Sequence, residues 1–115
     1  MTRGDVFTAR LDPTEGSEQA GMRPVVVVSR DAINRSSPVV VVVPCTSARR
    51  GRRIYPSEVL LRAPEGGLKS NSIALGGQLR AIAKTRLVRR WGALDAETMR
   101  KLDMALLITL DLPGQ

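Results

Sequence analysis

The sequence predicts a small, mainly β protein in which a β-barrel is closed by one C-terminal helix. Short runs rich in β-branched residues recur along most of the chain, and segments rich in Gly and Pro separate them. A single long pattern of helical periodicity follows at the end. With 115 residues, the chain is expected to form one domain over residues 1–115, which excludes a two-domain enzyme.

The first strand is predicted over residues 5–10, and a polar loop rich in Gly and Pro follows over residues 12–24. The next two strands, over residues 24–29 and 38–45, consist almost entirely of Val. Because these runs do not alternate with polar residues, we expect both faces of the two strands to be buried. Residues 31–37 between them are expected to form a turn or a single helical turn.

Three shorter strands are predicted over residues 58–62, 72–75 and 78–83. Residues 64–67 separate the first of these strands from the second, and Gly76 and Gly77 separate the second from the third. Several short strands followed by one packed helix fit a small barrel.

The C-terminal helix is predicted to begin after Asp95, a good N-cap residue, and to end at residues 113–114. Leu94 precedes the cap and is expected to pack on Met99 inside the helix. Apolar residues recur at helical spacing and are expected to form one face, which packs in the core or against a second copy of the chain: Met99, Leu102, Leu106 and Leu110.

The charge of the chain favours a polyanionic partner. Its 18 Lys and Arg residues outnumber its 11 Asp and Glu residues, which gives a formal net charge of +7. Fifteen of the 18 are Arg, whose planar guanidinium pairs with phosphate through two hydrogen bonds. They cluster over residues 49–53 and 86–90. Nucleic acid is therefore the first candidate partner, and an ordinary solvated surface in an Arg-rich protein is the alternative.

The composition also excludes several classes of site. The chain has no His and one Cys, so Cys-rich zinc sites are excluded, and no metal or cofactor is predicted. Cys45 has no His to activate it and is expected to be a small buried apolar residue. The N-terminal segment lacks the apolar region of a signal peptide, and the Val run over residues 39–43 is too short to span a bilayer. We therefore expect a cytoplasmic protein without a membrane partner.

Two motifs carry a resemblance to a known family. The chain contains GSEQ-x-G-x-RPVVVVS over residues 16–29 and P-x-TS over residues 44–47, with SIALGGQLRAIAKTRL downstream over residues 72–87. Through these segments the sequence resembles the MazF/PemK/Kid toxins of bacterial toxin–antitoxin systems, over about residues 3–112. The resemblance implies a homodimeric, SH3-like barrel that acts as a sequence-selective, metal-independent endoribonuclease on single-stranded RNA. It also implies a cognate MazE-like antitoxin that neutralises the toxin.

The residues themselves fit RNA cleavage by the 2′-hydroxyl of the substrate. That reaction requires removal of the hydroxyl proton, stabilisation of the charge on the phosphorus, and protonation of the leaving 5′-oxygen. Arg23, at the start of the rigid Pro24 strand, is suited to bind the phosphate, and Thr46 can donate a hydroxyl to a phosphate oxygen. The resemblance implies that these two residues are the catalytic pair.

Glu18 is the candidate for proton removal. A guanidinium stays protonated at neutral pH and is a poor general base, so we expect Arg23 to stabilise charge instead. Glu18 lies five residues before Arg23 on the same loop and could accept the proton or orient Arg23. Its alternative role is that of a loop carboxylate that caps backbone amides.

Further residues are expected to contact RNA. The resemblance places Gln78 beside the bound RNA, where its amide could read a base edge, and Arg80 would face the same side and pair with a phosphate. Either residue could instead make a structural contact between strands. The remaining candidates lie on the loop before Arg23 and on the Arg-rich segment after Thr46: Ser17, Gln19, Ser47, Arg49 and Arg50.

Two other functions stay open at this point. The CcdB gyrase poisons use the same barrel to bind a topoisomerase without catalysis, and a basic module could bind RNA without cutting it. The motifs that contain Arg23 and Thr46 favour the ribonuclease, because a gyrase poison does not need an Arg/Thr pair arranged for phosphate.

Overall fold

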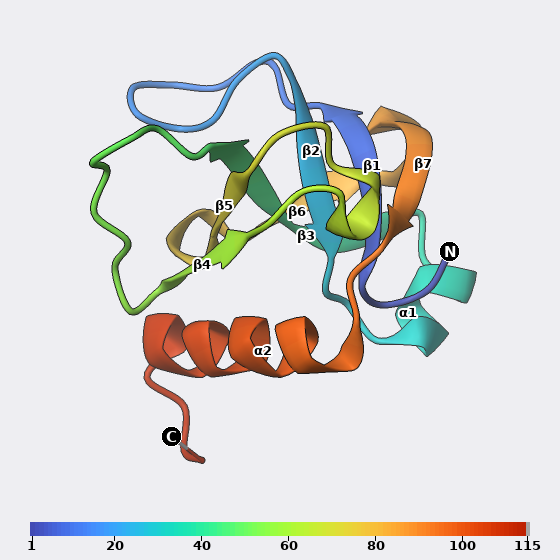
Figure 1. Cartoon of the computed structure of the whole chain (residues 1–115). Helices are drawn as coiled ribbons and strands as arrows, with labels where there is room; N and C mark the ends of the chain where they lie inside the picture. The colour runs from blue at the N-terminus through green and yellow to red at the C-terminus, as the bar shows by residue number, and fades with distance from the viewer. Residues whose placement is uncertain (115) are drawn as a thin grey trace.

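The computed structural model describes residues 1–114, in which seven strands form one curved sheet and the longer helix packs beneath it (Figure 1). The strands are β1 (Asp5–Arg10), β2 (Met22–Val27), β3 (Val39–Ser47), β4 (Glu58–Leu61), β5 (Ser72–Leu75), β6 (Arg80–Ala83) and β7 (Leu87–Ala93). The helices are α1 (Asp31–Ser36) and α2 (Ala96–Leu110), and the 3₁₀ turns are η1 (Glu65–Gly67), η2 (Gly76–Gln78) and η3 (Lys84–Arg86).

The sheet is antiparallel and open. Its strand order is β4-β5-β3-β2-β1-β7, and β6 pairs with β3 beside this path. Over residues 1–114, β4 and β7 do not pair with each other, so the strands alone do not form a closed barrel. The turn η1 packs against β7 instead. The predicted mainly-β fold with a C-terminal helix is confirmed, and its curvature is compatible with an SH3-like description.

Strand β3 connects the two parts of the sheet. Its first half pairs with β6 and its last three residues pair with β5, while β2 lies along its other edge. The strand continues to Ser47, two residues beyond the predicted end, so Thr46 lies within the sheet opposite Ile73.

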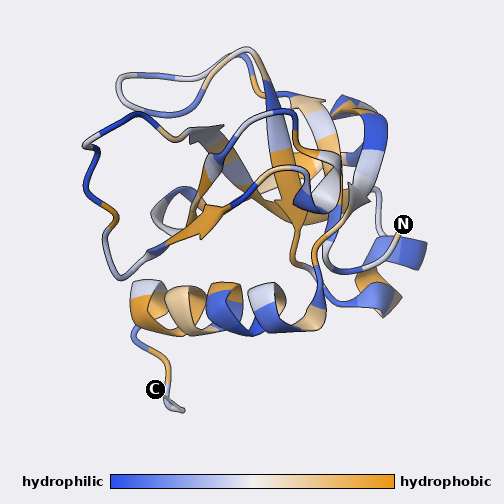
Figure 2. Ribbon diagram, viewed as in Figure 1, coloured by the Kyte–Doolittle hydropathy of each residue, from blue (hydrophilic) through white to orange (hydrophobic). Residues whose placement is uncertain are grey.

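The Val-rich strands are buried on both faces, as predicted. Val26 and Val43 belong to one core cluster, which also contains Leu102 of α2, whereas Val25 and Val42 belong to a second cluster on the other face. Successive residues of a strand point to opposite faces, so these strands fill both clusters at once. Figure 2 shows the corresponding band of hydrophobic strands in the centre of the molecule.

Helix α2 begins as predicted, and three of the four residues of its predicted apolar face, Met99, Leu102 and Leu106, pack in the core. The side chain of Asp95 accepts a hydrogen bond from the Thr98 backbone nitrogen at 2.8 Å, which is an N-cap interaction. Leu94 and Met99 pack in the same cluster. Leu102 is fully buried, but Leu110 is 50% exposed and does not contribute to the core. The helix ends at Leu110, where Asp111 adopts a left-handed conformation, three residues before the expected stop.

Two further differences concern the strands after β5. Residues 78–83 were predicted as one strand, but Gln78 lies in the turn η2 and β6 begins at Arg80. Strand β7 was not predicted.

Helix α1 forms where a single helical turn was expected. Over residues 1–114, no helix combines the length and apolar character needed to cross a membrane.

Candidate functional site

Arg23 lies on β2 and Thr46 on the neighbouring strand β3. The paired register of these strands runs from Val27 opposite Val42 to Val25 opposite Pro44, so Arg23 and Thr46 both lie just beyond its last pair. Both residues line a hollow of about 80 Å³, which Lys69, Ser70 and Trp91 also line. The two residues predicted as the catalytic pair therefore share one site.

Arg23 is held in place through one of its three nitrogens. Its Nε donates a hydrogen bond to the Ala20 carbonyl oxygen at 3.1 Å. Among the described residues, neither Nη1 nor Nη2 of Arg23 has a hydrogen-bond or ion-pair partner. A guanidinium fixed in this way presents its two terminal nitrogens to an anion, and phosphate is the anion that this geometry fits best.

Cys45 is fully buried beside Thr46, as expected for a small apolar residue. Burial raises the pKa of its thiol to about 12, because a thiolate would be poorly solvated there. The thiol is therefore protonated at neutral pH and is not a nucleophile.

Gln78 uses both ends of its amide to hold the loop between β1 and β2. Its Oε1 accepts a hydrogen bond from the Gln19 backbone nitrogen at 2.8 Å, and its Nε2 donates to the Ser17 carbonyl oxygen at 3.3 Å. This is a structural contact across two segments, the alternative that the sequence left open for Gln78. Gln19 keeps a buried Oε1 without a hydrogen-bond partner, so this oxygen is an acceptor that a ligand could use.

Glu18 and Arg80 lie in a neighbouring hollow of about 220 Å³, which Gln19 and Gln78 also line. Glu18 Oε1 accepts a hydrogen bond from the Glu15 backbone nitrogen at 2.8 Å, so this oxygen caps the loop. Arg80 Nη1 donates to the Leu11 carbonyl oxygen at 3.3 Å. Glu18 does not line the hollow that contains Arg23 and Thr46.

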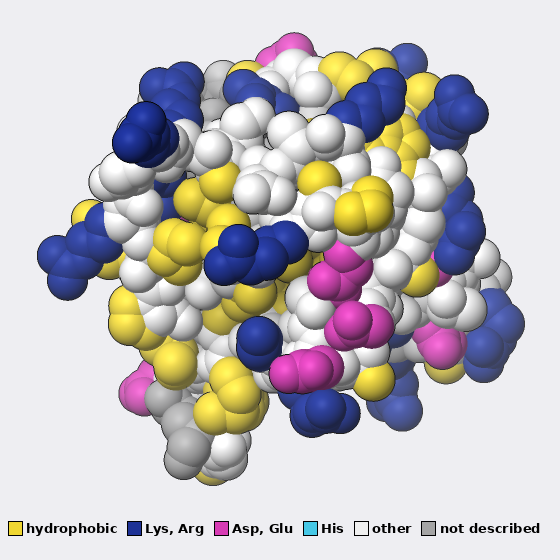
Figure 3. Space-filling view, viewed as in Figure 1, with side chains coloured by type: hydrophobic (Ala, Val, Ile, Leu, Met, Phe, Trp, Pro, Cys, Tyr) yellow, Lys and Arg dark blue, Asp and Glu magenta, His cyan; other side chains and the backbone are white. Residues whose placement is uncertain are grey.

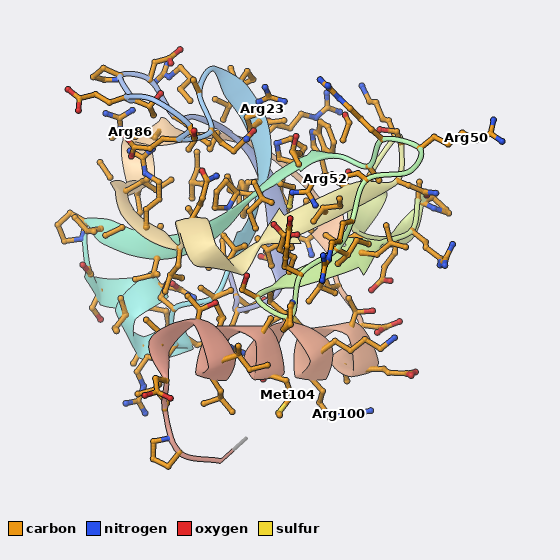
Figure 4. All side chains as sticks on the ribbon, turned by 90° about the vertical axis from the view of Figure 1, so that its left-hand side faces the viewer. Arg23, Arg50, Arg52, Arg86, Arg100 and Met104 are labelled. Carbon is orange, nitrogen blue, oxygen red and sulfur yellow. The ribbon has the colours of Figure 1, made fainter. Side chains whose placement is uncertain are left out.

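The Arg-rich loop between β3 and β4 is fastened by Glu58. Both terminal nitrogens of Arg52 donate to the Glu58 carboxylate, at 2.9 and 3.1 Å, and the Tyr55 backbone nitrogen donates to the same carboxylate at 3.1 Å. The hydrogen bonds from Arg52 hold the pKa of Glu58 below its usual range. Figure 4 shows Arg52 turned toward the sheet and Arg50 extending away from it.

Four hollows form a series in which each shares lining residues with the next, and we call the series the basic track. The hollow of Glu18 and Arg80 shares Gln19 and Gln78 with one of about 350 Å³, which is also lined by Arg49 and Arg52. That hollow shares Thr46 and Ser47 with the Arg23 hollow, which in turn shares Lys69 and Trp91 with a hollow of about 250 Å³. The cations along the track are Arg80, Arg49, Arg52, Arg23, Lys69, Arg89 and Arg90.

Two carboxylates, of Glu18 and Glu58, line the basic track, and Glu58 is paired with Arg52. Figure 3 shows basic side chains around the upper, left and right edges and in the middle of the visible face, with a group of acidic ones near the start of α2. An elongated surface with this excess of Arg suits the backbone of a single-stranded nucleic acid. Among the described residues, no group of three or more His, Cys, Asp or Glu side chains is arranged to hold a metal ion.

Sequence reasoning identified the Arg-rich segment that contains Arg52, but it missed several other residues of the track: Glu58, Lys69, Ser70 and Trp91. The basic cluster at residues 86–90 was a signal, but β7 was not predicted, so its residues could not be placed beside Arg23. Trp91 is the single Trp of the chain, which was a second signal.

Comparison with known protein families identifies the family of the chain. The model for the PemK-like, MazF-like toxin of type II toxin–antitoxin systems matches residues 2–110. The chain belongs to this toxin family. The resemblance found in the sequence motifs is therefore confirmed.

Two relatives of this toxin match over nearly their whole length. It is 41% identical to endoribonuclease MazF9 of Mycobacterium tuberculosis over 117 residues, which cover 97% of this chain and 98% of the relative. It is 42% identical to endoribonuclease EndoA of Bacillus subtilis over 112 residues, which cover 97% and 96%. Both relatives are named endoribonucleases, which is the activity predicted from the sequence. The predicted class of enzyme is therefore confirmed.

Solved structures agree with the fold of this toxin. A mycobacterial endoribonuclease in complex with its cognate antitoxin superposes with a TM-score of 0.80 at 27% identity, over 100% of this chain and 99% of the other. MazF from Deinococcus radiodurans superposes with a TM-score of 0.81 at 26% identity, over 97% of each chain.

Proposed function

We propose that this toxin cuts single-stranded RNA at selected sequences, without a metal ion, through attack of the RNA's own 2′-hydroxyl. The observation that carries the proposal is that Arg23 and Thr46, from neighbouring strands, line one hollow within the basic track. A polyanion that follows the track would place a backbone phosphate between these two side chains.

In this mechanism the two residues act on the phosphate. The Nη1 and Nη2 groups of Arg23 donate to its non-bridging oxygens, and the Thr46 hydroxyl donates from the opposite strand. The 2′-oxygen forms a bond to phosphorus while the bond to the 5′-oxygen breaks. These donors stabilise the charge that develops on the phosphorane, and the products are a 2′,3′-cyclic phosphate and a 5′-hydroxyl.

Two proton transfers complete the reaction. We assign the 2′-hydroxyl proton to Glu18, whose Oε2 has no partner among the described residues while its Oε1 caps the loop. This role requires the loop to bring Glu18 from its own hollow toward Arg23 when RNA binds. The leaving 5′-oxygen takes a proton from the guanidinium of Arg23, because an alkoxide is a stronger base than a neutral guanidine.

A second copy and an antitoxin complete the assembly that we propose. Apolar side chains are exposed at the C-terminal part of α2 and on the segment before β4: Met104, Ile108, Leu110, Ile54 and Tyr55. Such a patch suits a homodimer interface. The basic track suits an antitoxin segment with acidic and apolar residues, which would inhibit the toxin by covering Arg23. We place this system in the cytoplasm, where its substrate RNA is found.

The experiment is RNA cleavage in excess EDTA with mapping of the new ends. We expect discrete cuts with 2′,3′-cyclic phosphate and 5′-hydroxyl ends, lost in Arg23→Ala and in Thr46→Ala. Arg35→Ala is the matched control, because Arg35 lies exposed on α1 and lines none of the hollows of the track, whereas Arg100 lies beside Met104 on α2 (Figure 4). RNA that is bound but stays intact would favour a non-catalytic module, and RNA that is neither bound nor cut would favour a gyrase poison.

A further inference from the structure

We propose that the hollow lined by Lys69, Arg89, Arg90 and Trp91 is a nucleotide subsite, in which a base of the RNA stacks on Trp91 next to the cleaved phosphate. The subsite rests on the proposed function, since it takes the same RNA chain. It would set which nucleotides beside the cut contribute to binding.

The location of the hollow connects it to the Arg23/Thr46 site. Its volume is about 250 Å³, and it shares Lys69 and Trp91 with the hollow of Arg23. A nucleotide adjacent to a phosphate held by Arg23 therefore reaches it without leaving the protein surface.

Trp91 is a fixed platform. It is half-buried on β7 and packs against the core cluster that contains Val6 and Leu94, so one side of the ring is supported by the interior. The turn η1 lies close behind the strand, because a Cβ at Gly67 would lie only 2.8 Å from the Trp91 carbonyl carbon. A ring that is fixed before binding loses little conformational freedom when a base stacks on it.

Lys69 covers the ring in the absence of RNA. Its Nζ lies 5.4 Å from the centroid of the Trp91 ring, in a cation–π contact. Lys69 is exposed, and such a contact at an exposed site is weaker than stacking of a base on an aromatic ring. A base therefore displaces the ammonium group, and the flexible Lys69 side chain is free to move to a neighbouring phosphate.

The charges around the ring select a polyanion. Arg89 is exposed, and its side chain has no hydrogen-bond or ion-pair partner among the described residues. Arg90 Nη2 donates to the buried Asp5 carboxylate at 3.2 Å, which fixes this guanidinium, and Arg90 also lines the hollow. Three cations around one aromatic ring fit a base with its flanking phosphates.

The single Trp of the chain makes the subsite directly observable. We would titrate the whole toxin with RNA that carries 2′-O-methyl groups and cannot be cut, and record Trp91 emission and the anisotropy of an RNA label together. We expect the emission to change in a saturable way with the same Kd as the anisotropy. An abasic nucleotide beside the cleavage position should remove the emission change on one side of the cut only. Arg23→Ala should retain the emission change.

Variants test the same subsite through cleavage. We expect Trp91→Leu to lower kcat/KM about tenfold on a long RNA, which corresponds to about 1.4 kcal/mol. The loss should disappear on an RNA that is truncated on the side of the subsite and persist on one truncated on the other side. Trp91→Phe, which keeps a ring, should retain most of the activity and shows whether the loss reflects stacking or misfolding. Lys69→Gln should weaken binding of the long RNA and leave binding of the RNA truncated on the side of the subsite unchanged.

The outcomes separate this inference from the proposed function. Binding and cleavage of RNA with unchanged Trp91 emission, or equal activity of Trp91→Leu on all substrates, would overturn the subsite and leave the ribonuclease in place. A saturable emission change with RNA that is never cut would support the subsite and overturn the cleavage mechanism. An acidic peptide that changes the emission when RNA does not would overturn the subsite and assign the hollow to a protein partner.

Discussion

The Oε1 atom of Gln78 accepts a hydrogen bond from the backbone nitrogen of Gln19 at 2.8 Å, and this contact ties the turn η2 to the loop that precedes β2. The Nε2 atom of Gln78 donates to the Ser17 carbonyl oxygen in the same loop. Ala20, on this loop, accepts the hydrogen bond that holds Arg23. Gln78 therefore acts on Arg23 through the loop, as a positioning residue.

We expect Gln78→Ala to lower kcat/KM about tenfold at every cleavage site alike. A single hydrogen bond contributes about 0.5–1.5 kcal/mol and tenfold corresponds to about 1.4 kcal/mol, so the loss of two bonds is sufficient. The measurement is the cleavage rate at each site of a long RNA. Gln78→Glu keeps the acceptor for Gln19 and should lose less. A change in the preferred sequence at an unchanged overall rate would instead mean that Gln78 reads a base.

The pairing of Glu58 with Arg52 predicts a loop that loosens in acid. Hydrogen bonds from Arg52 lower the pKa of Glu58, so its contribution to stability is complete above the pKa of an unfolded Glu. That contribution is lost as the pH falls through the lowered pKa of the folded protein. We expect Glu58→Gln to flatten the acid side of a plot of the free energy of unfolding against pH. Denaturant unfolding between neutral pH and about pH 3 measures it.

The same substitution should affect RNA binding at neutral pH. Glu58→Gln releases Arg52 and the Tyr55 backbone nitrogen from a charged partner, so the loop between β3 and β4 becomes mobile. We expect a higher KM with little change in kcat. Glu97→Gln, at an exposed position in the first turn of α2 and outside the basic track, is the control for the loss of a negative charge alone, and Figure 4 shows Arg50 of the tested loop extending away from the sheet. Equal KM values for Glu58→Gln and the parent toxin would show that the pair does not position the loop.

The basic track predicts a steep dependence of RNA affinity on salt. Each phosphate that the track neutralises on a single strand contributes about 0.7 to the slope of log K against log salt concentration. We expect Arg49→Gln to reduce the slope by about this amount, and Arg35→Gln on α1 to leave it unchanged. Titrations of uncleavable RNA at several salt concentrations give both slopes. Equal slopes for the two variants would place the RNA elsewhere.

The sequence was sufficient where burial alone decides the structure. The Val runs predicted two-faced burial because successive Val residues in the middle of β2 and β3 point to opposite faces and pack in both core clusters, and Asp95 predicted the start of α2 because its cap is local. Strand β7 was missed because most of its residues are exposed and two Arg interrupt any apolar alternation. It forms through pairing with β1, a long-range contact that local patterns do not contain.

For the site, too, local sequence patterns identified residues, whereas their contacts depend on the fold. Arg23 and Thr46 were recognised from their motifs, but only the pairing of β2 with β3 brings them to one hollow. Glu18 was recognised as a loop carboxylate, and its hydrogen bond to Glu15 follows from a loop conformation that spacing does not specify. Lys69 and Trp91 meet because η1 packs on β7, and neither segment had a predicted neighbour.

The packing of η1 on β7 leads to a last prediction, for Gly67→Ala. Gly67 has a φ of +75°, and a Cβ there would lie 2.8 Å from the Trp91 carbonyl carbon. Gly51 has nearly the same φ of +79° but nothing within 4 Å, so Gly51→Ala is a matched control for backbone strain alone. We expect Gly51→Ala to cost about 1–2 kcal/mol in free energy of unfolding, and Gly67→Ala to cost about 1–3 kcal/mol more. Urea unfolding of both variants gives the difference. Equal losses would mean that η1 moves away from β7 freely, and Trp91 would then lack the rigid support that a stacked base requires.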